Sequence, residues 1–175
     1  MGSDVFVSPG AATNAFGGAV KVTSGFSDAT SSGNVEVATA SAGAVGVSGA
    51  VFVTTGDTTA GESGTVEIKT GAGVQGSGGD ISMIVGTGNT GNGGDIIGVA
   101  GETTDAAGVG GEVSITAGAG TSTDATDGGD GGDVVVTAGK AFGGNAVSDI
   151  GGDVFVSAGA ATNAFGGAVK VTSGF

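Results

Sequence analysis

Apolar residues recur along the chain in short alternating runs, separated by segments of small and polar residues. Residues 151–159, Gly-Gly-Asp-Val-Phe-Val-Ser-Ala-Gly, show the pattern most clearly. Alternation with a period of two predicts a β-strand with one buried face. The first apolar residues of the runs are Val5, Val20, Val35, Val51, Val66, Ile81, Ile96, Val113, Val134, Val154 and Val169.

These runs divide the chain into eleven repeat units with a period of about 15 residues. The longer spacings, such as the 21 residues from Val113 to Val134, come from the Gly-, Ala-, Ser-, Thr-, Asn- and Asp-rich segments, whose composition is typical of turns. A short, fixed period is typical of a solenoid, in which each unit stacks on its neighbours. The sequence therefore predicts an all-β fold, a single β-solenoid domain over residues 1–175.

Two windings of this predicted solenoid stay open. A coil of 15 residues would place each loop opposite its own strand, whereas a coil of 30 residues would form two facing parallel sheets. We favour the two sheets because loops such as residues 87–92 offer little apolar surface to cover a pair of valines. Within a strand, the small residue at the fifth position and the glycine before the strand share the inward face with the valines.

A longer repeat overlies the short one. Residues 2–26 and 151–175 are near-identical and differ only at Ser3/Gly152 and Pro9/Ala158, which gives a super-repeat of 149 residues. This spacing indicates a segment of a tandem array, whether natural or engineered.

Composition excludes several classes of function. The chain has no Cys and no His, which removes the common nucleophile–base pairs, and it has four Lys but no Arg, so we expect no enzyme. A net charge of −13 argues against nucleic acid and anionic membranes as partners. The sequence has no apolar run long enough for membrane insertion, and no signal peptide is visible after Met1.

Acidic residues directly precede successive runs and form the candidate metal site. If the runs stack as strands, these carboxylates lie about one strand spacing apart, and calcium would relieve their repulsion. The Gly/Asp-rich residues 127–133 add to this calcium hypothesis; the alternative is that the acids are solvated turn residues. The candidate ligands are Asp80, Asp95, Glu112, Asp133 and Asp153.

Residues at the second and fourth positions of each run would face outward. The fourth is often Ser or Thr, as at Thr23 and Thr116, which resembles the threonine ladders of ice-binding β-solenoids, although charges and Phe interrupt the second position. Exposed Phe6, Phe52 and Phe155 would mark a contact surface, and Phe16, Phe142 and Phe165 would close the core at one edge.

The Gly-Gly-Asp-Val-Phe-Val-Ser-Ala-Gly motif and its variants resemble the Gly-rich β-solenoid repeat modules of large secreted or surface structural proteins of algal or bacterial type. The resemblance covers the whole chain and implies a secreted, extracellular or cell-surface location. We therefore expect a structural repeat module of an extracellular filament, coat or adhesin that associates with itself head to tail. A surface glycan or another matrix protein is a further expected partner. The alternatives are an ice-binding β-solenoid and a calcium-dependent adhesin module.

Overall fold

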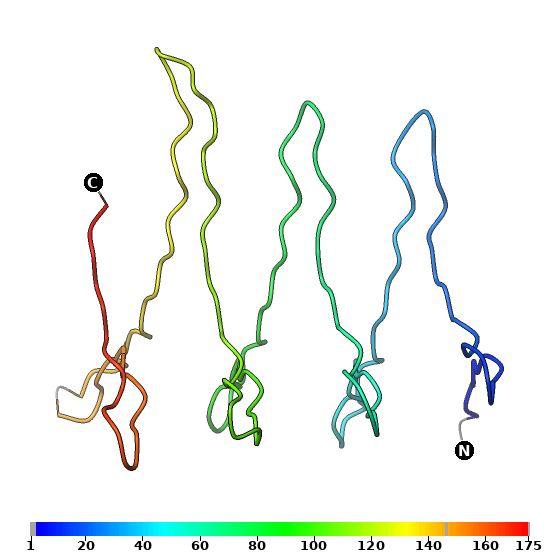
Figure 1. Cartoon of the computed structure of the whole chain (residues 1–175), viewed down its shortest axis with the longest axis horizontal. Helices are drawn as coiled ribbons and strands as arrows, with labels where there is room; N and C mark the ends of the chain where they lie inside the picture. Colours follow the sequence, from blue (N-terminus) through cyan, green and yellow to red (C-terminus); the bar gives the residue numbers. More distant parts are fainter. Residues whose placement is uncertain (1–2, 146, 175) are drawn as a thin grey trace. The chain divides into compact units, whose positions relative to one another are not determined.

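The computed structural model describes residues 3–145 and 147–174. Met1 lies outside these ranges, as do Gly2 and Phe175, the first and last residues of the two duplicated segments. Within them the chain forms neither a helix nor a strand (Figure 1). The predicted all-β solenoid is therefore wrong, and neither the 15-residue winding nor the two facing sheets of the 30-residue winding are present in the described residues.

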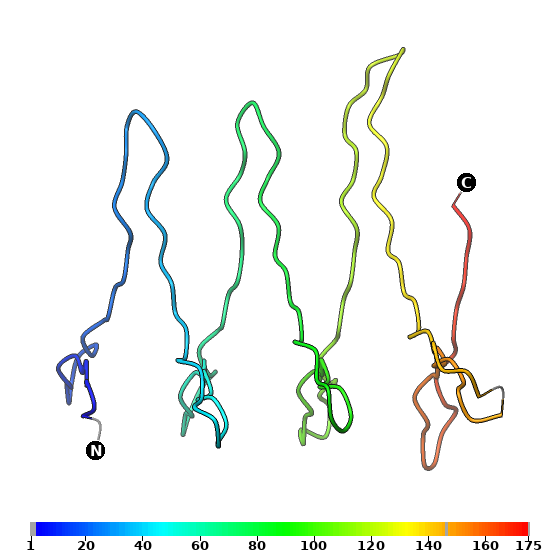
Figure 2. The same ribbon diagram turned by 180° about the vertical axis from the view of Figure 1, so that it is seen from behind.

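The chain instead alternates extended runs with local reversals, about one for each repeat unit. It divides into an N-terminal part, Met1–Met83, and a C-terminal part, Ile84–Phe175. Bends lie at residues 13–15, 28–30, 44–46, 59–61 and 74–76 in the first part, and at 89–91, 106–107, 125–127, 147–148 and 162–164 in the second. The reversals at 28–30, 74–76 and 125–127 can be followed from both sides in Figures 1 and 2.

Glycine allows several of these reversals because the backbone there takes a positive φ. Gly46, Gly61 and Gly91 have φ values of 139°, 106° and 76°. L-residues with a Cβ rarely adopt such angles. Gln75 has a φ of 60° in the bend at 74–76, in the left-handed region that non-glycine residues enter at a cost.

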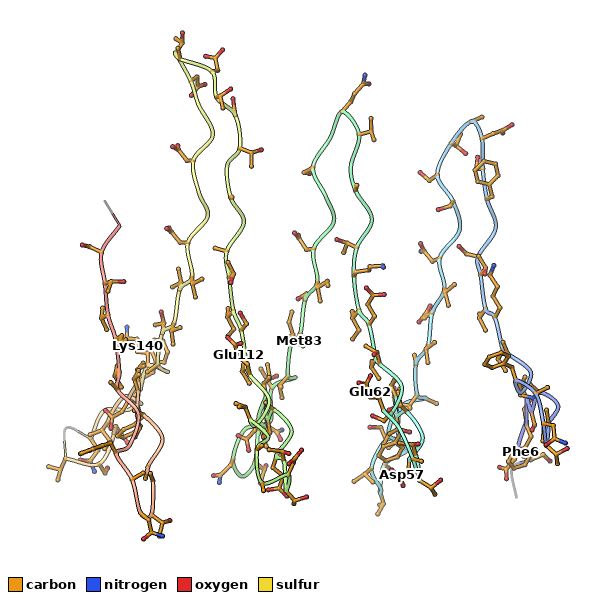
Figure 3. The ribbon with its side chains drawn as sticks, viewed as in Figure 1. Phe6, Asp57, Glu62, Met83, Glu112 and Lys140 are labelled. Atoms are coloured by element: carbon orange, nitrogen blue, oxygen red, sulfur yellow. The ribbon has the colours of Figure 1, made fainter. Side chains whose placement is uncertain are left out.

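No side chain is buried among the described residues, so the extended runs enclose no core. Phe16, Phe142 and Phe165, predicted to close the core at one edge, are exposed. Figure 3 shows the side chains projecting away from the ribbon. Across the same residues, no helix is long and apolar enough to span a membrane.

The prediction of strands failed for a physical reason. A strand is stabilised when a neighbouring chain pairs with its backbone along its whole length. Here, six of the ten pairs of successive runs are joined by a single backbone hydrogen bond at the base of the loop. With 42 glycines in 175 residues, ordering the backbone also costs more conformational entropy than it does for an average chain.

Candidate functional site

The most regular feature of the structure is the closure of the loop between successive runs. The glycine two positions before the first residue of a run, here called the closing glycine, lies beside the end of the preceding run. In six loops its N–H donates to the carbonyl oxygen of the residue that follows the run, at 2.8–3.0 Å. The pairs are Gly18 to Gly10, Gly33 to Gly25, Gly111 to Gly101, Gly132 to Gly118, Gly152 to Gly139 and Gly167 to Gly159.

At Gly18, Gly94 and Gly111 the closing position favours glycine because the opposite arm approaches closely. A Cβ added at Gly18 would lie 2.9 Å from the Cβ of Pro9, and one added at Gly94 would lie 2.9 Å from Cγ1 of Val85. Pro9 and Val85 both occupy the fifth position of their runs. The same neighbour, at 3.3–3.8 Å, recurs at Gly33, Gly49, Gly64, Gly79, Gly111, Gly132, Gly152 and Gly167.

This contact sets the register of neighbouring runs. Pro9 lies opposite Gly18, and side chains alternate along an extended chain. Two residues further out on both arms, Val7 at the third position therefore comes opposite Val20 at the first position of the next run. The same rule places Val136 opposite Val154.

The ten first positions that follow another run are 51–63 % exposed, whereas Val5 in the first run is 91 % exposed. Val134 lies opposite Ile115 and is 54 % exposed. Each run thus partly covers the first position of the next, although none of these residues is buried.

Asp124 organises the loop at 119–131. Its Oδ1 accepts the N–H of Thr126 at 2.8 Å and that of Asp127 at 3.0 Å. These two backbone donors favour the charged form and hold the pKa of Asp124 below its ordinary value of 3.8. The N–H of Gly129 also donates to the carbonyl oxygen of Ser122 at 3.3 Å, so this insertion is an ordered turn.

A second insertion is held between Asn145 and Asp149. The N–H of Asn145 donates to Oδ2 of Asp149 at 2.7 Å, and the N–H of Asp149 donates to the carbonyl oxygen of Asn145 at 2.9 Å. The N–H of Val147 donates to Oδ1 of Asn145 at 3.0 Å. Both long insertions therefore use an acidic side chain to satisfy backbone amides.

Two lysines make local contacts that the sequence pattern does not predict. Nζ of Lys140 lies 4.7 Å from the ring centroid of Phe142, within the range of a cation–π contact. Nζ of Lys69 pairs with Oε1 of Glu67 at 3.1 Å. Both pairs are exposed to solvent, so each stabilises its own segment by little.

The predicted metal ligands lie one residue after a closing glycine and are exposed. In residues 3–145 and 147–174, no three acidic side chains come close enough together to hold a metal ion. The structure therefore gives the calcium hypothesis no preformed group of three ligands there. This applies to Asp80, Asp95, Glu112, Asp133 and Asp153.

The described residues form neither a binding pocket nor a flat threonine ladder. Residues 3–145 and 147–174 enclose no pocket. Thr23 and Thr116 belong to extended runs without sheet partners, so the predicted outward threonines form no flat ladder.

Comparison with known proteins adds no relative. No protein-family model matches the chain, and no curated protein or solved structure is similar to it.

The candidate functional surface is the repeated apolar surface of the runs, together with the closed loops that set the register of these runs.

Proposed function

We propose that the protein is a structural repeat module that works by associating with copies of itself in an extracellular filament, coat or adhesin. The exposure of its apolar side chains carries this proposal. Every first- and third-position Val, Ile or Met in the described runs is accessible to solvent. Large exposed apolar surfaces in soluble proteins mark contact sites with other molecules.

The size of the exposed surface supports an assembled working state. The single chain exposes 17209 Å². A compact protein of 15.8 kDa would expose about 7,300 Å², and a fully extended chain of that mass about 23,000 Å². Because removing apolar surface from water is the main driving force for association, contacts between copies would supply the stabilisation that the single chain lacks.

Repetition makes a second copy of the chain a suitable partner. The same pair of apolar positions recurs about every 15 residues, and the loop closures hold neighbouring runs in one register. Two chains could therefore make the same contact many times, which raises avidity without strengthening any one contact. The net charge of −13 opposes this contact and would keep association reversible at low salt.

The extracellular location is supported by the likeness to Gly-rich repeat modules of secreted surface proteins. In that setting, a surface glycan or another matrix protein would be a further partner.

Sedimentation velocity over a range of protein concentrations tests the proposal, with electron microscopy of the same samples. The average mass is expected to rise above 15.8 kDa with concentration, and elongated or sheet-like particles are expected in the images. A variant with Val22→Thr, Val53→Thr and Val156→Thr keeps side-chain shape but removes apolar surface, and should associate at least tenfold more weakly. A 15.8 kDa species at every concentration would contradict the proposal.

A further inference from the structure

Closure of a loop depends on the residue at the fifth position of the preceding run. Six loops close with the hydrogen bond of the closing glycine, and the fifth residue before each of them is Pro, Ser or Ala. Within the described residues the other four loops lack this bond, and they are called open loops here. The fifth residue before each open loop is β-branched: Thr39, Thr55, Thr70 or Val85.

The branch of the fifth side chain explains this difference. In every open loop, a Cβ added at the closing glycine would meet only that side chain and no backbone atom within 4 Å. At Gly94 the atom met is Cγ1 of Val85, at 2.9 Å, whereas at the closed Gly18 the backbone nitrogen of Gly10 also lies at 3.2 Å. The spacing from Gly86 to Gly94 equals that of this closed loop, so loop length does not decide closure. The second heavy atom on Cβ of the β-branched residue keeps the two arms apart.

The loop that Val85 holds open contains the only Asn-Gly sequence of the chain, Asn92-Gly93. Both residues are exposed, and a Cβ added at Gly93 would meet nothing within 4 Å. Among the described residues, no backbone hydrogen bond restrains the N–H of Gly93. The backbone nitrogen of Gly93 is therefore free to approach Cγ of Asn92, and glycine places no side chain in its way.

We propose that Asn92 is a site of spontaneous covalent modification, and that Val85 sets the rate of this modification by holding the loop open. Asparagine is a thermolabile residue, and the reaction needs only water and a mobile backbone. It takes place within a single chain, so it is independent of the proposed self-association.

The reaction has two steps. The backbone nitrogen of Gly93 loses its proton to hydroxide and bonds to Cγ of Asn92. The bond between Cγ and Nδ2 breaks, and Nδ2 takes up a proton from water and leaves as ammonia, which closes a succinimide ring. Water then opens the ring: attack at Cγ gives aspartate, and attack at the backbone carbonyl carbon gives isoaspartate. Either product adds one negative charge to the net charge of −13.

Peptide mapping by tandem mass spectrometry tests the site, after incubation of the dilute unchanged chain at neutral and mildly alkaline pH. Asn92 is expected to deamidate several-fold faster than Asn89, which lies in the same loop but precedes Thr90. The rate at Asn92 should rise with pH, because the attacking nitrogen must lose its proton. Gly93→Ala should slow it several-fold. Equal rates at Asn89 and Asn92 would overturn the site.

The role of Val85 is tested with Val85→Ala, which gives this loop the fifth residue of most closed loops. The N–H of Gly94 is then expected to donate to the carbonyl oxygen of Gly86, which slows hydrogen exchange at Gly94 and slows deamidation of Asn92 several-fold. Thr70→Ala is the matched control, because it removes the branch before a different open loop and should leave the rate at Asn92 unchanged.

The outcomes for Val85 separate its two parts. Unaltered hydrogen exchange at Gly94 in Val85→Ala would show that the fifth residue does not control closure. Slower exchange at Gly94 with unaltered deamidation of Asn92 would show that closure does not set the rate of modification. An equal fall in the rate at Asn92 in Thr70→Ala would also overturn the role of Val85, since the effect would then not be local to its loop.

Discussion

The N–H of Gly152 donates to the carbonyl oxygen of Gly139 at 2.9 Å, and residues 140–151 lie between them. Gly18 makes the same bond to Gly10 at the same distance, with only residues 11–17 between them. Loops of different length are thus closed at the same two places in the repeat. The closing glycine, and not the loop, sets the register of the runs.

The neighbouring glycines 110 and 111 test this role. A Cβ at Gly111 would lie 3.2 Å from the backbone nitrogen of Gly101 and 3.3 Å from the Cβ of Ala100, whereas one at Gly110 would make only an ordinary contact at 3.8 Å. Gly111→Ala is expected to destabilise the closed form of the loop by about 0.5–1.5 kcal/mol, the net free energy that one hydrogen bond contributes. Gly110→Ala should leave it intact.

Hydrogen exchange of the amide at position 111, followed by NMR, measures this effect. Exchange should be several-fold faster in Gly111→Ala than in the unchanged chain, and unaltered in Gly110→Ala. Equal exchange in both variants would show that the closing position does not require glycine.

The loop around Asp124 is expected to loosen in acid. Two backbone N–H donors lower the pKa of this carboxyl, so its folded-state pKa lies below 3.8. The charged carboxylate therefore stabilises the turn fully above pH 3.8, and this stabilisation is lost as the pH falls through the folded-state pKa. NMR titration should show the amides of Thr126 and Asp127 shifting in that range. Asp124→Asn keeps an acceptor oxygen and should abolish this pH dependence, and a titration at 3.8 or above would contradict the turn.

Dilute protein is expected to show no cooperative unfolding transition when it is heated. A compact domain of 175 residues would absorb about 120 kcal/mol on unfolding, chiefly because packed contacts are lost together. The described residues have no core, and each loop closes by itself. Scanning calorimetry below the association range should show no peak; a sharp endotherm from the monomer would reveal a packed core.

Salt and pH should control association through charge. The chain carries a net charge of −13 and has an isoelectric point near 4.1. Because salt screens repulsion between exposed charges, raising sodium chloride from about 10 mM to about 150 mM should increase the average mass in sedimentation. Lowering the pH toward 4.1 should do the same, and a fall in mass with salt would show that ion pairs hold the copies together.

Calcium and magnesium are expected to act alike at equal ionic strength. No group of three acids in the described chain is close enough to select calcium. The triple variant Asp80→Asn/Glu112→Gln/Asp153→Asn should then respond to both ions as the unchanged chain does, apart from its lower charge. Association driven by calcium alone and lost in this variant would instead support the calcium hypothesis.

The sequence predicts the repeat and its division into runs and loops, but not how the runs pair. An alternation such as Val5-Phe6-Val7 shows which side chains share a face. It does not show whether a neighbouring chain supplies a ladder of hydrogen bonds, and the described residues contain none. The small fifth position and the closing glycine, assigned to one face by the same alternation, do lie together, as Ala138 and Gly152 do.

The acidic residues show the same limit for the candidate site. Asp80 and Asp95 recur at one place in the repeat, but recurrence brings carboxylates together only if the units stack. Asp124, the acid with a lowered pKa, lies in an insertion and is not one of the predicted site residues. Its signal was local: an Asp followed two residues later by Thr126 is typical of a side chain that caps its own turn.

Closure at two fixed glycines leaves the sequence between them open to change. The loop at 119–131 already carries an insertion that shorter loops lack, and Gly132 still meets Gly118. Loop residues can therefore be added or removed, by gene duplication or slippage, while neighbouring runs keep the same register. A foreign epitope placed between Ser122 and Gly129 would be displayed on the same scaffold, which makes this loop a natural site for grafting.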